Sequence, residues 1–584
     1  MKDTDVSDAG RPDGRRSSRE TLRLRAATRA LRLHLDELPV VFHYDGAGDQ
    51  FLAEAAFPFA RQRYDCAESM IGAGFGGAVL GSLARSLFVD GLRWLWIGQA
   101  PKSRRICLLG SMLEERNRIC LALERYDASC PILPRWFAPL VGVTDLTGSS
   151  KTWLQAPALP HETDLLNIFL TGDHPATAGS NDLLSAAQRM LNIAGLRGAV
   201  MILSHAGHGN LLGLQSCLTE NGAVGHDLRP DHEALYMHMA AVGVTLTLFG
   251  VSAAVPESWP AEVEHEEFLR QTLRLTEEVV ASATVVHGLG PSQATQPAGK
   301  ASKIQSAPPA LLRPQVILDH SEILPDVNKA DRVIAAAEKY YDYVQSFAID
   351  PWQAGEPVKL ANILTYAGAN SSLTAVMSTY DREGSAVIAV FAARMLLEEA
   401  ARFHWMIDGK SEDEIKQRFQ QFFEDYRARR KKVVGLFTGS GMASASKLLE
   451  LPAHVEIKTP HEQISKGRKP LPSIEEMLLG LGSPFPEPGW LNIAYSLLSQ
   501  VAHSTPIGNL HMTSYRDGTL RSNDITPEML GLTLDAACLG SAYLISISEL
   551  FLSQGDEDVR ERGRELHRLA YDVHNEARML HGLD

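Results

Sequence analysis

The stretch FGGAVLGSLARSLFVDGLRWLWIG at residues 75–98 has a counterpart in the second half of the chain, GSAVIAVFAARMLLEEAARFHWMI at 384–407. The two align without gaps. The paired residues include Ala84 with Ala393, Arg85 with Arg394, Asp90 with Glu399, and Arg93 with Arg402. Both stretches are apolar nearly all round and rich in helix-forming residues, which predicts a buried helix in each half.

Two further elements follow in the same order in both halves. LSHAGHGN at 203–210 matches LSQVAHST at 498–505 and pairs His208 with His503. A long apolar segment comes after each of them. Recurrence of three elements in one order is the mark of an internal repeat. We therefore predict an all-α protein of two related helical-bundle lobes that arose by internal duplication.

The composition of the chain suggests where the lobes begin and end. A stretch rich in Pro, Ser and Ala is expected to be a linker, and the polar N-terminus is expected to be a disordered tail rather than a secretory signal. The predicted parts are a tail at 1–20, lobe 1 at 21–284, a linker at 285–316, lobe 2 at 317–555 and a charged C-terminal helix at 556–584. Strands are expected to be scarce, with 38–45 and 451–460 as the candidates.

Length and charge limit the classes of function. A chain of 584 residues with a net charge of -14 can bury large cores, and it lacks the excess of Lys and Arg that non-specific nucleic-acid binding needs. The six cysteines form no CxxC pair and no zinc-type spacing, which predicts reduced thiols and a cytoplasmic location.

One segment is long enough to cross a membrane. Residues 234–255 contain no Lys, Arg, Asp or Glu. Their counterpart at 529–551 carries Asp535, and a carboxylate is costly inside a bilayer. We therefore expect two buried helices of a soluble protein and no membrane span.

The repeated helices carry charged pairs in apolar surroundings. Asp90 and Arg93, like Glu399 and Arg402, are three residues apart and so lie side by side on a helix. Buried charges need partners, and a histidine at the end of another buried helix can supply one. We expect two networks, one in each lobe. Their members are Asp90, Arg93 and His208 in the first, and Glu399, Arg402 and His503 in the second.

Two interpretations of these networks stay open. They either fix the register of the helices in the core or form a catalytic site. A histidine and carboxylate metal site is a third possibility, since His205 and His208 are three residues apart, but no carboxylate stands at a typical ligand spacing.

Basic residues cluster at 426–434, and a phosphate or RNA contact there is a further hypothesis. The residues concerned are Arg427, Arg429, Arg430, Lys431 and Lys432. The glycine-rich GAGFGGAVLG at 72–81 follows no predicted strand, so we expect close helix packing there and not a phosphate loop.

The Leu-Ser-x-x-x-His helix that follows an Arg and acid helix resembles HEPN-type helical domains and similar families of prokaryotic defence and stress systems. The resemblance is best from 390 to 509. It implies a helical fold and, in active members, metal-independent RNA cleavage by an Arg-x(4–6)-His motif, with proton transfer and phosphate stabilisation by the two side chains. That motif occurs here outside the repeated elements, at Arg29/His34, Arg313/His320 and Arg568/His574.

The sequence therefore leaves three functions open. The first is a helical binding or regulatory protein, with a defence or stress role implied by the resemblance. The second is an RNA- or nucleotide-processing enzyme of HEPN-like type, and the third is a metal-dependent enzyme.

Overall fold

The computed structural model describes most of the chain. The described ranges are 19–38, 48–71, 77–115, 159–171, 182–217, 228–290, 330–346, 357–450, 471–481, 488–552 and 557–582, with short breaks at 109, 113, 209–210, 257–258, 261–262, 383, 410, 517–518 and 523–524. The predicted tail except Arg19 and Glu20, most of the predicted linker, and the two strand candidates apart from Leu38 lie outside these ranges.

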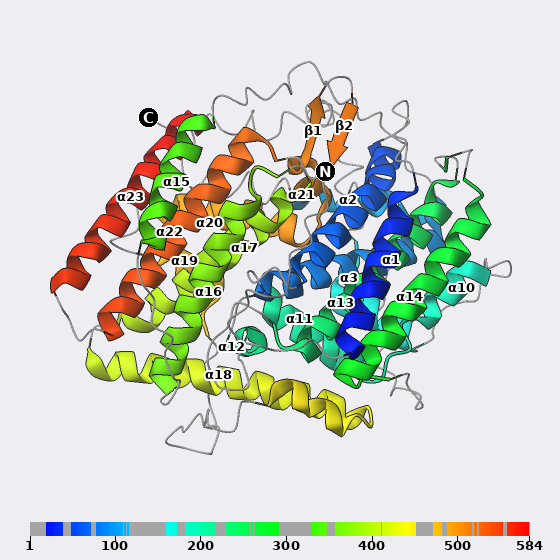
Figure 1. The fold of residues 1–584 in the computed structure, drawn as a ribbon, viewed down its shortest axis with the longest axis horizontal. Coiled ribbons are helices and arrows are strands. Elements are labelled where there is room, and N and C mark those ends of the chain that lie inside the picture. Colours follow the sequence, from blue (N-terminus) through cyan, green and yellow to red (C-terminus); the bar gives the residue numbers. More distant parts are fainter. Residues whose placement is uncertain are drawn as a thin grey trace.

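The all-α prediction is confirmed, because helices make up nearly all of the described secondary structure (Figure 1). The first half contains α1 (Arg19–Asp36), α2 (Gly48–Met70), α3 (Gly77–Gln99), α4 (Pro101–Arg104), α9 (Glu162–Thr171), α10 (Asp182–Arg189), α11 (Leu196–Gly207), α12 (Leu211–Leu214), η4 (Gln215–Cys217), α13 (Pro230–Ala254) and α14 (His265–His287).

The second half has a similar series of helices and one small sheet. Its elements are α15 (Asp331–Gln345), α16 (Pro357–Thr379), α17 (Ala386–Ile407), α18 (Glu412–Gly439), η8 (Ala443–Leu449), α19 (Ile474–Leu479), α20 (Pro488–Ala502), α21 (Pro506–His511), β1 (Thr513–Arg516), β2 (Thr519–Ser522), α22 (Pro527–Leu552) and α23 (Glu557–His581). The two strands pair antiparallel, with Thr513 opposite Ser522 and Arg516 opposite Thr519.

Helices in the same order make the same packing contacts in both halves. In the first half α3 packs against α2, α11 and α13, and in the second half α17 packs against α16, α20 and α22. Likewise α14 lies on α1 and α13, while α23 lies on α15 and α22. The helices that carry the repeated sequence elements therefore occupy corresponding places.

The most apolar helices, α13 and α22, are buried in the middle of the two halves. Residues 230–254 and 527–547 are long and apolar enough to cross a membrane, and both segments are covered by protein over the whole of their most apolar window. Around Asp535, which is only 1% exposed, the indole N–H of Trp490 donates a hydrogen bond at 2.9 Å and His574 Nδ1 lies at 3.1 Å. The carboxylate in this apolar helix is thus paired inside the protein.

Glycines allow the central helices to cross at close range. A Cβ atom on Gly243 of α13 would lie 2.4 Å from the carbonyl carbon of Leu87 on α3, and one on Gly540 of α22 would lie 2.9 Å from that of Leu396 on α17. Gly81 belongs to the glycine-rich stretch, and a Cβ atom added to it would lie 2.4 Å from the Cβ atom of Ala206 on α11. Its expected role in close helix packing is confirmed.

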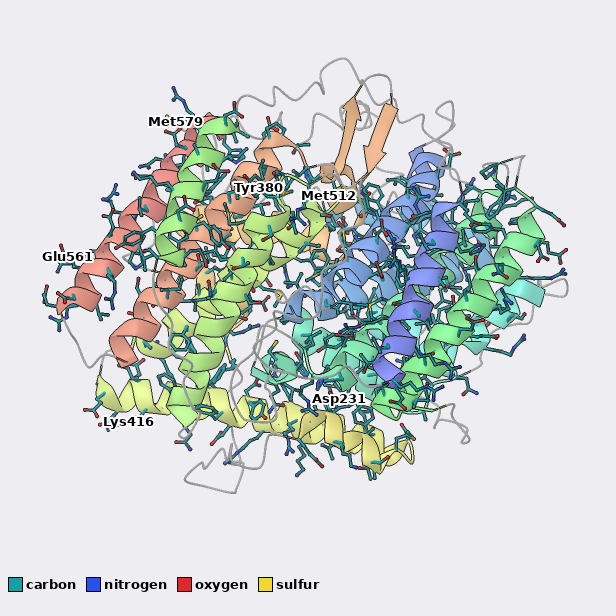
Figure 2. The ribbon with its side chains drawn as sticks, viewed as in Figure 1. Asp231, Tyr380, Lys416, Met512, Glu561 and Met579 are labelled. Carbon is teal, nitrogen blue, oxygen red and sulfur yellow. The ribbon has the colours of Figure 1, made fainter. Side chains whose placement is uncertain are left out.

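The two halves share one hydrophobic core, and the buried apolar residues of both form a single continuous cluster. Met512, which is fully buried, lies between the two groups of helices, whereas Met579 and Glu561 lie at the outer edge of the second half (Figure 2). The long helix α18 runs along one side of the molecule and packs against α11 and α12 of the first half as well as α17 (Figure 1). Across the junction of the halves, α3 packs against α16, α17 and α20.

We expect Gly243→Ala to destabilise the protein strongly, because the added methyl group meets backbone atoms that cannot rotate away. Overpacking of this kind costs on the order of 1–3 kcal/mol or more. Gly540→Ala should cost less, since its nearest contacts are longer. The measurement is the free energy of unfolding in urea.

The matched control is Gly435→Ala on the exposed face of α18, where nothing lies within 4 Å of the added atom. This change should stabilise the helix slightly. Equal effects at Gly243 and Gly435 would contradict the close crossing.

Candidate functional site

Two histidines from opposite halves meet at the junction. His208 is the C-cap of α11, and its backbone N–H donates to the Ser204 carbonyl. His503 follows α20 in the same way and donates to the carbonyl of Ser499 at 2.9 Å. The two imidazole rings lie 6.3 Å apart between centroids. The paired motifs of the sequence therefore come together at one place.

His503 is held by arginines of the first half. Arg85 on α3 donates from Nη1 to Nδ1 of His503 at 3.1 Å. Arg93, two turns further along α3, donates from Nη1 to the His503 carbonyl at 2.8 Å. Carbonyls at the end of a helix have no partner within the helix, so they are natural acceptors for a guanidinium.

His208 is held by the corresponding arginines of the second half. Arg394 on α17 donates from Nη1 to the Gly207 carbonyl at 2.7 Å, and its Nη2 lies 3.2 Å from Nδ1 of His208. Arg402 donates to the His208 carbonyl at 2.5 Å. Each half thus supplies the arginines that hold the histidine of the other half.

This crossing corrects the expected composition of the networks. His208 does not join Asp90 and Arg93, and His503 does not join Glu399 and Arg402. The bodies of α11 and α20 pack in their own halves, but their C-terminal ends reach the junction, where the facing helix belongs to the other half.

The acidic partner in the second half is Glu398, and the predicted pairing of Glu399 with Arg402 is wrong. Glu398 lies one turn from both Arg394 and Arg402, contacts Arg394 at 3.2 Å and forms an ion pair with Arg402. These two guanidiniums, with His208, outweigh the effect of burial and lower the pKa of Glu398 to about 2.

Glu399 has no such partners. Its side chain is buried, and its Oε1 atom makes no hydrogen bond to the residues that the structure describes. Burial raises its pKa to about 8, so the carboxyl is largely protonated at neutral pH. The residue that aligns with Asp90 is therefore not the one that pairs with the arginines in the second half.

The acid of the first half is Asp90, as expected, but it has a second partner that the sequence analysis missed. Arg63 on α2 is completely buried and contacts Asp90 at 3.1 Å, while Arg93 contacts it at 3.3 Å. Arg63 also donates to Ser504, a residue with a left-handed φ of 49°, and to Asn509 at 2.8 Å. Asp90 thus links α2 and α3 to the segment that follows His503.

The site carries an excess of positive charge. The guanidiniums are those of Arg63, Arg85, Arg93, Arg394 and Arg402, and the carboxyl groups paired with them are those of Asp90, Glu398 and Glu162, which contacts Arg85 at 2.6 Å. Burial, together with nearby arginines, lowers the pKa of His208 and lowers that of His503 well below its ordinary value. Both rings are therefore neutral at physiological pH, and the surplus of guanidiniums favours an anionic ligand.

His208 and Arg93 are partly open to solvent. The side chain of His208 is 32% exposed, and that of Arg93 is 19% exposed. In both rings the hydrogen-bond partners lie at Nδ1, and Nε2 makes no hydrogen bond to any described residue. The Nε2 atoms of the two rings are thus without a described partner.

Three other described histidines have partners away from this site. His238 pairs with His287 at 2.9 Å, and His232 pairs with Asp231. Within the described ranges, no group of three or more His, Cys, Asp or Glu side chains is arranged to hold a metal ion.

The Arg-x(4–6)-His matches also lie elsewhere. His34 contacts Phe268 and Thr272, His574 is bound to Asp535, and the side chain of Arg568 is 50% exposed. Arg313 and His320 are outside the described residues.

The basic stretch lies on α18. Arg429 is ion-paired with Asp425, Arg430 donates to the Leu449 carbonyl, and Lys431 and Lys432 are exposed. Arg429 and Lys432 contribute, after burial, to lowering the pKa of His205 to about 3. The positive charge of α18 therefore reaches the end of α11 that carries His208.

Glu399→Gln should stabilise the protein increasingly as the pH rises. The pKa of this carboxyl is about 8 in the folded chain against an ordinary value of 4.5, so ionisation favours the unfolded chain between these values. The wild-type protein therefore loses stability as the pH rises from 4.5 to about 8. The glutamine variant has no proton to lose at this position, so its stability does not fall for this reason. The difference in free energy of unfolding between the variant and the wild type should grow in favour of the variant by ~2 kcal/mol or more from pH 5 to pH 8.

The measurement is urea unfolding at several pH values, with Glu561→Gln on the exposed face of α23 as the control. A difference that does not change with pH would show that Glu399 is ionised in the folded protein.

Comparison with protein-family models, with curated proteins and with solved structures finds no match to this chain. Its function must therefore be argued from the side chains at the junction.

Proposed function

We propose that the protein cleaves RNA at the junction of its two halves without a metal ion. The observation that carries this proposal is the meeting of His208 and His503, 6.3 Å apart. Each histidine has its carbonyl bound by one arginine of the opposite half and a second arginine of that half close to Nδ1. Two imidazoles among guanidiniums provide a proton acceptor, a hydrogen-bond donor and positive charge for a phosphate group.

His208 is the general base in this proposal. Its Nδ1 lies 3.2 Å from Oε1 of Glu398, which is ionised, so the N–H at Nδ1 donates to the carboxylate. The lone pair of the neutral ring then stands at Nε2. In the first half the position of Glu398 is taken by Val89, so only one histidine has a carboxylate behind it.

His503 has the opposite tautomer. Because Arg85 donates to its Nδ1, the proton of the neutral ring is at Nε2, where it can donate to a phosphate oxygen. Arg93 adds a second donor, since its Nη2 has no partner among the described residues.

The proposed reaction is attack by the ribose 2′-oxygen on phosphorus. His208 Nε2 takes the 2′-hydroxyl proton, the O2′–P bond forms and the bond from phosphorus to the 5′-oxygen breaks. The leaving oxygen takes a proton from water, which gives a 2′,3′-cyclic phosphate and a 5′-hydroxyl. His503 and Arg93 stabilise the charge that develops on the phosphoryl oxygens.

The rest of the RNA backbone would follow α18. Arg427, Arg429, Arg430, Lys431 and Lys432 give this helix positive charge, and part of it already acts on the His205 and His208 region. The resemblance to HEPN-type domains supports the same reaction class and a role in defence or stress.

We further infer that the two halves arose by duplication. The shared order of helix packing supports this inference, as do Gly213 and Gly508, which abut the carbonyls of the aligned residues His205 and Gln500. Four free, buried cysteines among the described residues agree with a cytoplasmic location.

A binding or regulatory protein is the second candidate. It is favoured by the backbone carbonyls of the network, which accept from Arg93, Arg394 and Arg402 and so hold the halves together. In that case His503→Ala lowers the melting temperature, and the protein cleaves no RNA.

RNA cleavage is tested with a pool of single-stranded RNA, with and without EDTA. We expect cleavage in both conditions and products with 2′,3′-cyclic phosphate ends. His208→Ala should reduce the rate by about 10²–10⁴-fold, the usual contribution of a general base. His265→Ala on α14, at the outer side of the first half, is the control and should keep full activity (Figure 1). Absence of cleavage, or cleavage that persists in His208→Ala, would refute the proposal.

Glu398→Gln tests the role of the carboxylate behind His208. Glu398 raises the pKa of His208 against the lowering by burial. The amide should therefore move the acid limb of the pH–rate profile to lower pH and reduce kcat. A profile of unchanged shape would remove Glu398 from the mechanism.

A further inference from the structure

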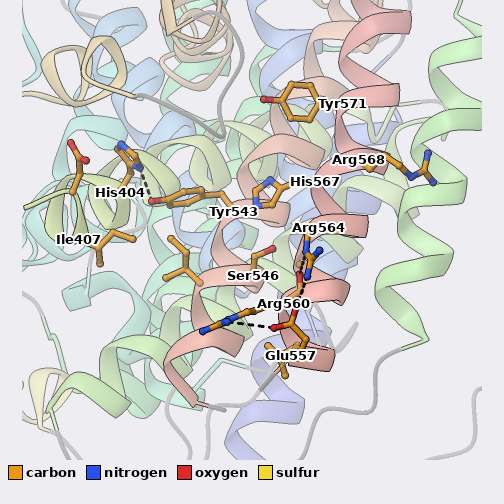
Figure 3. A pocket seen from close by; sticks show the side chains of 14 residues that line it. His404, Ile407, Tyr543, Ser546, Glu557, Arg560, Arg564, His567, Arg568 and Tyr571 are labelled. Carbon is orange, nitrogen blue, oxygen red and sulfur yellow. Dashed lines mark hydrogen bonds and ion pairs between the residues drawn. The ribbon is translucent and has the colours of Figure 1, made fainter. Parts of the chain in front are cut away.

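A separate pocket of about 840 Å³ opens between the end of α17, α22 and α23 (Figure 3). Its size is in the range of small-molecule sites. Ile407, Ile547 and Val559 give it apolar walls, and the rings of His404, Tyr543, His567 and Tyr571 also line it. The pocket shares no residue with the junction of the two halves.

Ser546 is a buried polar group with no partner in this pocket. The residue is 5% exposed, and its hydroxyl makes no hydrogen bond to the described residues. Nearby Ser541 on the same helix donates to the carbonyl four residues earlier at 2.7 Å, so the helix itself does not prevent such a bond. A buried hydroxyl without a partner is costly and calls for an explanation, and a ligand that bonds to it is one.

The wall of the pocket at Ser546 also has free space. Gly563 of α23 faces it, and a Cβ atom added there would lie 3.5 Å from Cβ and Oγ of Ser546, which is ordinary contact. No close packing of the backbone requires a glycine at position 563. Its effect is to leave space beside Ser546.

The two histidines of the pocket are neutral at physiological pH, and the charged side chains that line it are exposed at the rim. Burial lowers the pKa of His567 to about 4 and lowers that of His404, whose Nδ1 lies 2.6 Å from the Tyr543 hydroxyl. The rim carries charges of both signs, which include the exposed Asp408 and three arginines. Arg560 and Arg564 contact Glu557, Arg568 contacts Glu565 and Asp572, and their side chains are half or more exposed.

We infer that this pocket binds a neutral, planar aromatic molecule that offers a hydrogen-bond acceptor or donor to Ser546. The rings and aliphatic walls suit a flat apolar body, and the charged side chains lie at the exposed rim, where water weakens their attraction for an ion. The rim arginines are ion-paired and half or more exposed, so they favour a carboxylate or a phosphate only weakly.

The test uses lumichrome, a neutral and fluorescent tricyclic heterocycle, with 2-naphthoate as the anionic comparison. Titration of the full chain should give saturable lumichrome binding. Gly563→Leu, which fills the space beside Ser546, should weaken it at least tenfold. Gly435→Leu on the exposed face of α18, where nothing lies within 4 Å, is the matched control and should leave binding unchanged.

Ser546→Ala gives a second readout that does not depend on filling the pocket. It should raise the melting temperature of the free protein, because an unpaired hydroxyl is removed, and weaken lumichrome binding severalfold. The inference is overturned by absence of saturable lumichrome binding, by equal binding to Gly563→Leu, by tighter binding of 2-naphthoate, or by a lower melting temperature of Ser546→Ala. Loss of RNA cleavage in the junction variants has no bearing on any of these outcomes.

Discussion

Guanidiniums buried in helical cores must find acceptors, and in this protein they find them at the C-terminal ends of α11 and α20. The last carbonyls of a helix lack partners within it and carry the negative end of its dipole. Arg394 donates to the carbonyl of Gly207, and Arg402 donates to that of His208. Arg93 donates to the carbonyl of His503. The helix ends are therefore fixed where the arginines lie, and the two imidazoles are fixed with them.

This constraint explains why the fold and the site were not equally predictable. Apolar, Ala- and Leu-rich segments and the repeated motif were sufficient to predict an all-helical chain with Arg93, Arg402, His208 and His503 as members of polar networks. They carried no information on which half each histidine faces. Arrangement across a junction depends on tertiary packing, which periodicity within one helix does not encode.

Three further features were not predicted from the sequence, and the reasons are local. Glu398 and Glu399 both precede Arg402 at helical spacing. Glu398 differs in that it lies four residues from Arg394 as well as four residues from Arg402, and it contacts both. Arg63 lies in a helix that the repeat did not include. The hairpin at 513–522 had a visible signal, the Asp517-Gly518 pair between short polar strands, which is typical of a tight turn.

Glu398 and Val89 occupy aligned positions on α17 and α3, yet only one of them is charged. In a symmetric homodimer any substitution appears twice, so both histidines would gain or lose a carboxylate together. A single chain that contains both halves is free of this restriction. Selection can then tune the proton affinity of one imidazole while the other keeps a different neighbour, and the two positions can become specialised without loss of the shared architecture.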